Sequence, residues 1–184
     1  MKHIIKPAFA LFIIAAISTA LLGFARDLTL EPIQNQRRRT QENTMKEILT
    51  EAAEFKELEI KKTGSISRIF EGRTGGQLVG YVVELSPSGY SGAIDIMAGI
   101  SVSKNELAGL RVLRHTETPG LGALAVKENF YSKYDGKKLV PLRVVRVSPG
   151  ENDIEAITGA TITTRAITEA VNEAIEWYNR EARK

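Results

Sequence analysis

A run of uncharged residues near the N-terminus constrains this chain more than any other feature. Residues 7–25 are 19 consecutive residues without a charged side chain, and Ala, Ile, Leu and Phe dominate the run. A helix needs roughly 20 apolar residues to cross the hydrocarbon core of a bilayer. The run therefore predicts a transmembrane helix over 7–25, after a short tail at 1–6. A cleaved signal peptide is the alternative, because Lys2 and Lys6 give a basic start and 23–25 offers a crude cleavage site.

The charges that flank the apolar run leave its orientation open. Lys2 and Lys6 lie before the run, which favours a cytoplasmic N-terminus. Arg26 and the arginines at 37–39 follow it, within the roughly 15 to 20 residues that also count toward orientation. Charge alone is therefore compatible with either orientation.

Composition excludes several kinds of chemistry. The 184 residues are 43% hydrophobic and 26% charged, which is typical of one globular domain of ordinary size. The chain has no Cys and only two His, of which His3 precedes the apolar run, so a disulfide, an iron–sulfur cluster, a cysteine nucleophile and a multi-histidine metal centre are excluded. Beyond residue 25 the chain has 23 basic and 22 acidic side chains, which argues against a nucleic-acid surface. Any redox group must come from outside the chain.

The rest of the chain has the pattern of an α+β domain. Residues 34–62 contain no Gly or Pro and place apolar residues at helical spacing, which predicts a polar connecting helix over 26–62. Segments 65–70 and 78–85 have the pattern of a hairpin that turns at 72–76. Segments 93–102 and 107–114 have the pattern of two strands joined at 103–106, and 139–147 is predicted to be a further strand. Beyond Thr163 the spacing becomes helical again. We expect an antiparallel sheet with flanking helices over 63–184.

Three glycine-containing stretches could carry chemistry, at 89–92, 115–122 and 158–163. Each has a structural alternative: Pro119 and Gly120 have the form of a type II turn, and a lone His is commonly a hydrogen-bonded structural residue. The third stretch opens the C-terminal helix, where unpaired N–H groups and the helix dipole stabilise a phosphate. The alternative there is N-capping by Thr161 or Thr163. Composition and spacing thus suggest a phosphate-bearing ligand without identifying it.

The third stretch resembles the signature of the FMN-binding domain family. Its pattern is an acidic residue, two variable residues, Ser or Thr, and then Gly-Ala-Thr-x-Thr; here it runs from Glu155, where the family more often has Asp, to Thr163. In that family the FMN phosphate is joined to a threonine hydroxyl by a phosphoester bond. The resemblance implies FMN as the cofactor and Thr163 as its covalent acceptor.

The resemblance extends over nearly the whole chain. The apolar segment, the polar segment, the Gly-Tyr-Ser-Gly stretch, the 115–122 stretch and the terminal signature occur in one order. In this the chain is similar to the G subunits of Rnf electron-transport complexes, with the C subunits of sodium-pumping NADH:quinone reductases as relatives. It implies a single-pass inner-membrane protein with a cytoplasmic tail at 1–6 and a periplasmic FMN-binding domain at 63–184. It also implies the other subunits of the complex and a Mg-dependent flavin transferase as partners, whereas the near-neutral charge already argues against nucleic acid.

The expected function is electron transfer by covalent FMN, in a membrane complex that couples ferredoxin and NAD chemistry to Na⁺ or H⁺ translocation. We expect no complete active site and no metal site in this chain, so it is a redox subunit first and an enzyme only within the assembly. The alternative is a membrane-anchored adaptor without its own flavin. Gly89 and Gly92 are expected near the flavin. His115 is compatible with a place near the flavin and equally with a structural role. The predicted cofactor-binding residues are Tyr90, Glu117, Thr118, Gly120, Leu121, Gly122, Thr158, Gly159, Ala160, Thr161 and Thr163.

Overall fold

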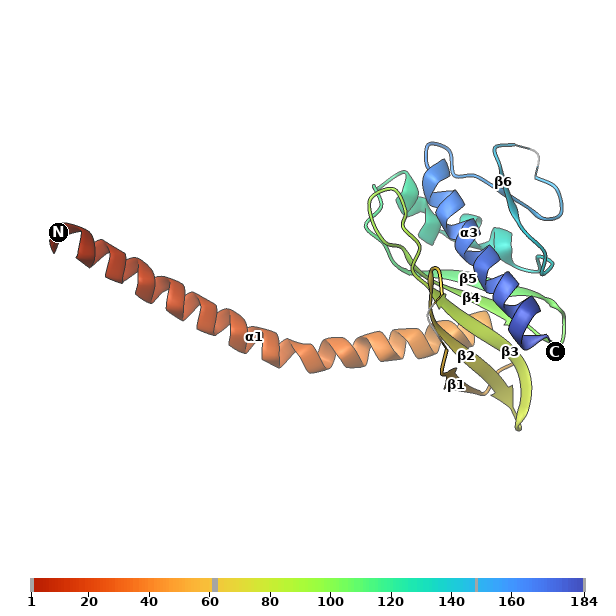
Figure 1. The fold of residues 1–184 in the computed structure, drawn as a ribbon, viewed down its shortest axis with the longest axis horizontal. Coiled ribbons are helices and arrows are strands. Elements are labelled where there is room, and N and C mark those ends of the chain that lie inside the picture. The colour runs from red at the N-terminus through yellow and green to blue at the C-terminus, as the bar shows by residue number, and fades with distance from the viewer. Residues whose placement is uncertain (1, 61–62, 148, 184) are drawn as a thin grey trace. The chain divides into compact units, whose positions relative to one another are not determined.

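The structure, a computed structural model, describes residues 2–60, 63–147 and 149–183. The chain forms two compact units, residues 1–42 and residues 43–184 (Figure 1). Helix α1 (Lys2–Ile48) supplies the whole described part of the first unit and the beginning of the second, to which the other helices and strands of the described residues belong.

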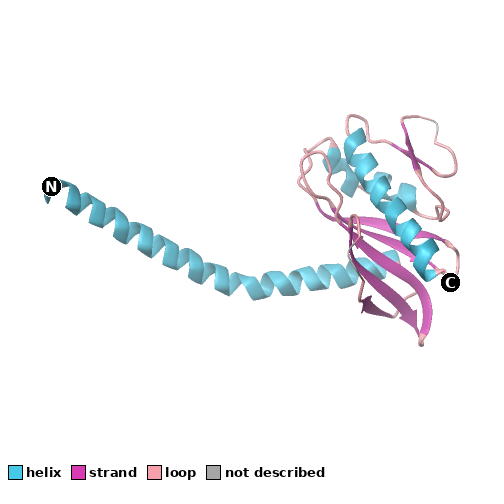
Figure 2. Ribbon diagram, in the orientation of Figure 1, coloured by secondary structure: helices cyan, strands magenta, loops and turns pink. Residues whose placement is uncertain are grey.

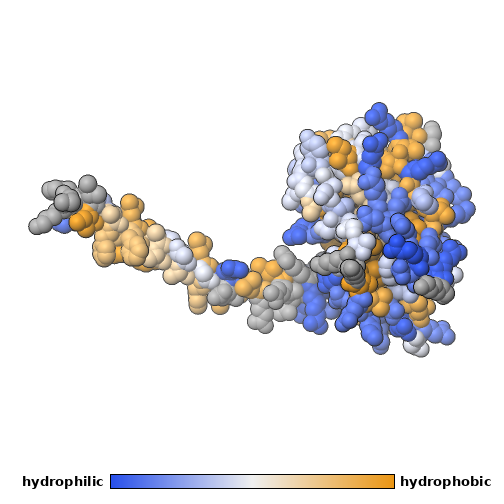
Figure 3. Space-filling model, viewed as in Figure 1, coloured by the Kyte–Doolittle hydropathy of each residue, from blue (hydrophilic) through white to orange (hydrophobic). Residues whose placement is uncertain are grey.

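The described part of the first unit is a single helix whose surface is apolar over much of its length. Within α1, Ile5–Leu30 is long and apolar enough to cross a membrane. Its apolar side chains are exposed, as the hydrophobic surface in Figure 3 shows; Phe9, Leu22 and Phe24 are each more than 60% exposed. The helix predicted over 7–25 lies inside this span. Of the expected tail at 1–6, residues 2–6 are helical and Met1 lies outside the described residues.

The helix expected over 26–62 ends earlier than its spacing suggests. It stops at Ile48, and Glu54–Leu58 forms strand β1 instead, while residues 61 and 62 lie outside the described residues. Strand β1 pairs antiparallel with the edge of the next strand, from Glu54 opposite Arg73 to Leu58 opposite Ile69. Phe55 and Leu58 are three residues apart, a spacing that alone indicates a helix. Pairing with a neighbouring strand has overridden this local preference.

The second unit is built on a five-stranded antiparallel sheet in the order β1-β2-β3-β4-β5. The hairpin of β2 (Ile66–Thr74) and β3 (Gln77–Leu85) turns through Gly75 and Gly76 alone, and both have positive φ, as a two-residue hairpin turn demands. The predicted turn at 72–76 is therefore shorter than expected. Strands β4 (Asp95–Ser101) and β5 (Glu106–Arg114) confirm the predicted pair.

Both faces of the sheet are buried. Helix α3 (Thr161–Trp177) lies along one face (Figures 1 and 2), where Ile167 and Val171 pack with Ile69, Val83 and Ile96. The alternating residues of the same strands face the other way and pack against the segment around the end of α1. The remaining short helices are η1 (Gly122–Val126), α2 (Glu128–Tyr131), η2 (Ser132–Tyr134) and η3 (Tyr178–Ala182).

Glycines in the strands allow the end of α1 to approach the sheet backbone. A Cβ atom on Gly99 would lie 2.2 Å from Ile48 Cγ2, and one on Gly72 would lie 2.5 Å from Leu49 Cδ2. A Cβ atom on Gly80 would lie 2.3 Å from the backbone oxygen of Ile100. Glycine normally weakens a strand. In this sheet the close approach of neighbouring atoms explains why glycine occupies these positions.

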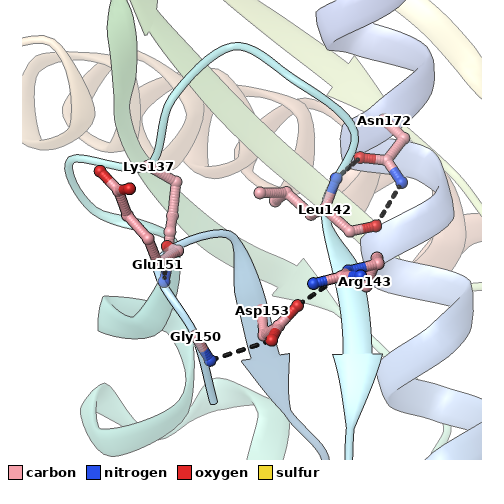
Figure 4. Close-up of polar contacts among 7 residues, drawn as sticks. All are labelled: Lys137, Leu142, Arg143, Gly150, Glu151, Asp153 and Asn172. Carbon is pink, nitrogen blue, oxygen red and sulfur yellow. Dashed lines mark hydrogen bonds and ion pairs between the residues drawn. The ribbon is translucent and has the colours of Figure 1, made fainter.

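A small parallel pair, β6 (Arg143–Val145) and β7 (Asp153–Glu155), leads into the signature segment. The strand predicted over 139–147 is therefore only three residues long. Pro141 has no N–H group to donate, and the backbone of Leu142 is occupied by the Asn172 side chain of α3 through bonds of 2.8 and 3.0 Å (Figure 4). Asp153 accepts from the Gly150 N–H, which lowers the pKa of its carboxyl, and from Arg143 (Figure 4).

We predict that Gly99→Ala lowers the free energy of unfolding by about 1–3 kcal/mol, because the added methyl group overpacks against Ile48. Ile48→Ala removes the clashing Cγ2, so Gly99→Ala should cost less in that background. Gly80→Ala is the matched control, since its clash is with a backbone oxygen that Ile48→Ala leaves in place. Denaturant unfolding of the full chain in detergent, followed by Trp177 fluorescence, measures all five variants. Equal relief of both glycine substitutions by Ile48→Ala would contradict this packing.

Candidate functional site

The signature segment places the start of α3 without a side-chain cap. The N-cap residue is Ala160, whose methyl side chain cannot accept a hydrogen bond. The alternative in which Thr161 or Thr163 caps the helix is therefore wrong, because neither residue occupies the N-cap position. Thr164 holds the preceding turn in place: its Oγ1 accepts from the Ile157 N–H at 3.1 Å and donates to the Ala160 carbonyl at 3.1 Å. The first N–H groups of a helix have no intrahelical acceptor, so this end of α3 is suited to an anion.

Thr163 and Glu117 form a buried pair. The Thr163 hydroxyl donates to Glu117 Oε2 at 2.7 Å, across 46 residues of chain, and the two residues are 1% and 6% exposed. The other carboxylate oxygen, Oε1, accepts from the Ser91 N–H at 2.9 Å. One carboxylate therefore joins the three glycine-containing stretches that the sequence singled out.

The loop that carries Glu117 is fixed by its own backbone. Gly120 has φ 78°, and the Leu121 N–H donates to the Thr118 carbonyl at 3.1 Å, which confirms the type II turn at Pro119 and Gly120. His115 accepts at Nδ1 from the Glu117 N–H at 3.2 Å. This bond supports the loop, which is consistent with the structural role considered for His115.

Two glycines leave room for the carboxylate. A Cβ atom on Gly122 would lie 2.3 Å from Glu117 Oε2 and 2.7 Å from Thr163 Oγ1. A Cβ atom on Gly89 would lie 2.4 Å from Glu117 Oε1. Any side chain at either position would displace the pair, so the glycines act on the site through the space they leave beside the two polar groups. Gly92 leaves comparable room for the side chain of Thr116, because a Cβ atom on Gly92 would lie 2.6 Å from Thr116 Oγ1.

A pocket of about 390 Å³ opens beside this pair. Glu117 is the one charged side chain among the described residues that line it. Apolar side chains stand at its mouth, since Tyr90 is 71%, Ile162 56% and Leu121 43% exposed. The lining residues are Tyr90, Glu117, Thr118, Leu121, Gly122, Gly159, Ala160, Thr161, Ile162 and Thr163.

Of the eleven residues predicted to bind the cofactor, nine line this pocket, whereas Gly89 and Gly92, also expected near the flavin, do not. Thr158 and Gly120 do not line the pocket; Gly120 shapes the turn behind it instead. Ile162 lines the pocket but was not predicted. The sequence did contain a signal for it: Ile162 is an apolar residue in the first turn of α3, on the side of the helix that does not face the core, and an exposed apolar residue there indicates a contact with a ligand. Glu155 is not among the lining residues, and its carboxylate pairs with Lys133 Nζ at 3.0 Å.

The pocket fits the cofactor that the sequence predicts. FMN combines a phosphate, a polar chain and a flat, largely apolar ring. The uncapped start of α3 is suited to the phosphate, and the apolar residues at the mouth are suited to the ring. The volume is within the range of roughly 300–1,000 Å³ that small-molecule sites occupy.

Comparisons with known proteins agree with this assignment. Residues 89–176 match the FMN-binding domain family, and residues 1–48 match the RnfG N-terminal region. The chain is 31% identical to the G subunit of the Na⁺-translocating ferredoxin:NAD⁺ oxidoreductase complex of Acetobacterium woodii, over 96% of this chain and 92% of that one. It is also 31% identical to the G subunit of the ion-translocating oxidoreductase complex of Methanosarcina acetivorans, over 98% and 97% of the two chains.

A solved structure is similar to part of this chain. The C subunit of the Na⁺-translocating NADH-quinone reductase of Parabacteroides distasonis superposes with a TM-score of 0.52 and 26% identity, over 61% of each chain. This similarity covers the fold of less than two thirds of either protein.

We predict that Gly122→Ala destabilises the unmodified chain by about 1–3 kcal/mol, because its methyl group overlaps the Glu117 carboxylate. In a Glu117→Ala background the same substitution should cost less, with a coupling energy of about 0.5 kcal/mol or more. Gly120→Ala is the control: its Cβ would meet no atom within 4 Å, so its cost comes from backbone strain and should be equal in both backgrounds. Additive costs for Gly122→Ala and Glu117→Ala would contradict the contact.

Proposed function

This chain belongs to the family of G subunits of ion-translocating oxidoreductase complexes, and on that premise we propose that it carries electrons on FMN bound covalently to Thr163. The complex couples electron transfer between ferredoxin and NAD to translocation of Na⁺ or H⁺. FMN supplies the redox chemistry when bound, because its ring accepts and releases electrons. The chain itself binds, orients and shields that group.

One observation carries the proposal: Thr163 lines a pocket at an uncapped helix start. A phosphate esterified at this oxygen would meet the free N–H groups and the positive end of the helix dipole of α3. No Lys or Arg is among the described lining residues, so the pocket has no cationic side chain with which to hold a free phosphate. A covalent bond supplies the retention that ion pairing does not.

The remaining pocket residues suit the rest of the cofactor. Gly159 and Ala160 allow close approach to the backbone at the phosphate end. Tyr90, Leu121 and Ile162 would contact the apolar ring from the mouth of the pocket. The Thr118 and Thr161 hydroxyl groups can hydrogen-bond the polar chain between these ends. The ring would stay accessible to a redox partner, as an electron carrier requires.

The apolar helix supports a membrane location for this chain. Ile5–Leu30 is the candidate span. We assign the N-terminal residues to the cytoplasm and residues 63–184 to the periplasmic side, following the family resemblance. In that location the chain contacts the other subunits of the complex, and a Mg-dependent flavin transferase attaches the cofactor after export.

We predict that the Thr163 peptide from the native host is heavier than its sequence by the mass of FMN less one water. Thr163→Ala should abolish this mass and the ultraviolet fluorescence of the denatured protein band, because it removes the acceptor oxygen. Thr163→Ser keeps a hydroxyl and should retain both. Thr161→Ala, at the same pocket, is the control and should leave the Thr163 adduct in place. Peptide mass spectrometry measures each variant.

Two outcomes would contradict the covalent assignment. An unmodified Thr163 peptide from yellow protein would indicate FMN held without a bond. A colourless protein from the native host would favour the alternative function, a membrane-anchored adaptor without its own flavin.

A further inference from the structure

The Thr163 hydroxyl differs in its hydrogen bond from three other threonines that lie in helices. Thr164 and Thr168 donate to the carbonyl four residues earlier, at 3.1 and 2.8 Å, as helical threonines commonly do. Thr19 in α1 does the same, at 2.8 Å. Thr163 instead donates to a carboxylate at 2.7 Å. Its proton is therefore directed at a group able to accept it.

We propose that Glu117 is the general base that takes the proton from Thr163 as the phosphoester bond forms. This inference rests on the proposed attachment of FMN at Thr163. The distance of 2.7 Å between Oγ1 and Oε2 is within the roughly 2.6–3.2 Å that proton transfer to a general base requires. A threonine hydroxyl is a weak nucleophile until an adjacent base removes its proton.

The reaction also requires an activated donor. A free phosphate monoester has only a poor leaving group, so the incoming flavin must be a phosphoanhydride of FMN. The Thr163 Oγ1–P bond forms and the P–O bond of the anhydride breaks, with its electron pair leaving on the departing phosphate. The proton passes from Oγ1 to Glu117 Oε2. Nothing is oxidised or reduced in this step.

The surroundings of Glu117 fit a base that must be held in place. The Ser91 N–H fixes Oε1 at 2.9 Å and so leaves Oε2 for Thr163. Gly122 leaves open space beside both the hydroxyl and Oε2, since its missing Cβ would occupy it. Glu117 is the one charged side chain among the described residues lining the pocket, so no other described carboxylate or amine there can take its place.

Proton transfer also answers an electrostatic problem that attachment creates. The phosphodiester brings a negative charge next to a carboxylate that is 6% exposed. Like charges this close disfavour each other strongly in a buried site. Taking the Thr163 proton neutralises the carboxylate, so base catalysis lowers this repulsion as the diester forms.

The test follows the rate of adduct formation on the full chain in detergent. The chain is incubated with the flavin transferase of its host and flavin adenine dinucleotide, a phosphoanhydride of FMN, and the Thr163 peptide mass is followed in time. Glu117→Gln keeps the size of the side chain and an oxygen acceptor but cannot take the proton. We expect modification to slow by about 100-fold or more, with an unchanged unfolding temperature. Glu169→Gln makes the same change at an exposed residue of α3 outside the pocket lining and should modify at the wild-type rate.

A second variant separates a base from a positioning role. Glu117→Ala removes the carboxylate and opens space, and added formate should restore part of its modification rate in proportion to concentration. A correctly folded Glu117→Gln chain that modifies at the wild-type rate would overturn the inference, as would a Glu117→Ala chain that formate does not rescue. A wild-type chain that never gains the adduct would instead overturn the proposed function itself.

Discussion

A buried carboxylate is the constraint on which the site depends. An ionised group removed from water must be matched by donors, and Glu117 obtains them from Ser91 and Thr163. These partners lie on segments far apart in the sequence, so the bond holds the 89–92 stretch, the 115–122 loop and the start of α3 together. Gly89 and Gly122 make the arrangement possible because they leave room for its oxygens. The site is thus organised around one side chain before any cofactor is bound.

The rest of the second unit holds this arrangement in place. Helix α3 packs along one face of the sheet through Ile167 and Val171, which fixes the position of its N-terminal turn and of Thr163. Asn172 secures the same helix to the backbone of Leu142. The end of α1 covers the opposite face of the sheet. Its side chains can pack close to the backbone there because the strands carry glycines at the points of contact. A rigid sheet with both faces covered suits a site whose hydroxyl and carboxylate must stay at a fixed separation.

Local signals predicted much of this fold, and contacts distant in sequence decided the rest. The Gly75–Gly76 hairpin and the C-terminal helix follow from turn chemistry and periodicity, which act over a few residues. Strand β1 lies where a helix was predicted, because Phe55 and Leu58 have helical spacing and only the edge of β2 makes them a strand. The signature indicates Thr163 through a family resemblance. Its bond to Glu117 spans 46 residues, and no local pattern in a single sequence encodes such a pair.

Phosphorus NMR of the full chain purified from its native host tests the central claim most directly, because it reports the bonding of the phosphate itself. A diester at Thr163 has no second ionisation, so its resonance should keep one position from about pH 5 to pH 8 and should persist after denaturation and dialysis. A phosphate monoester loses a second proton near about pH 6, so its resonance moves across that range. A resonance that shifts with pH, or that disappears when the protein is unfolded and dialysed, would contradict covalent attachment.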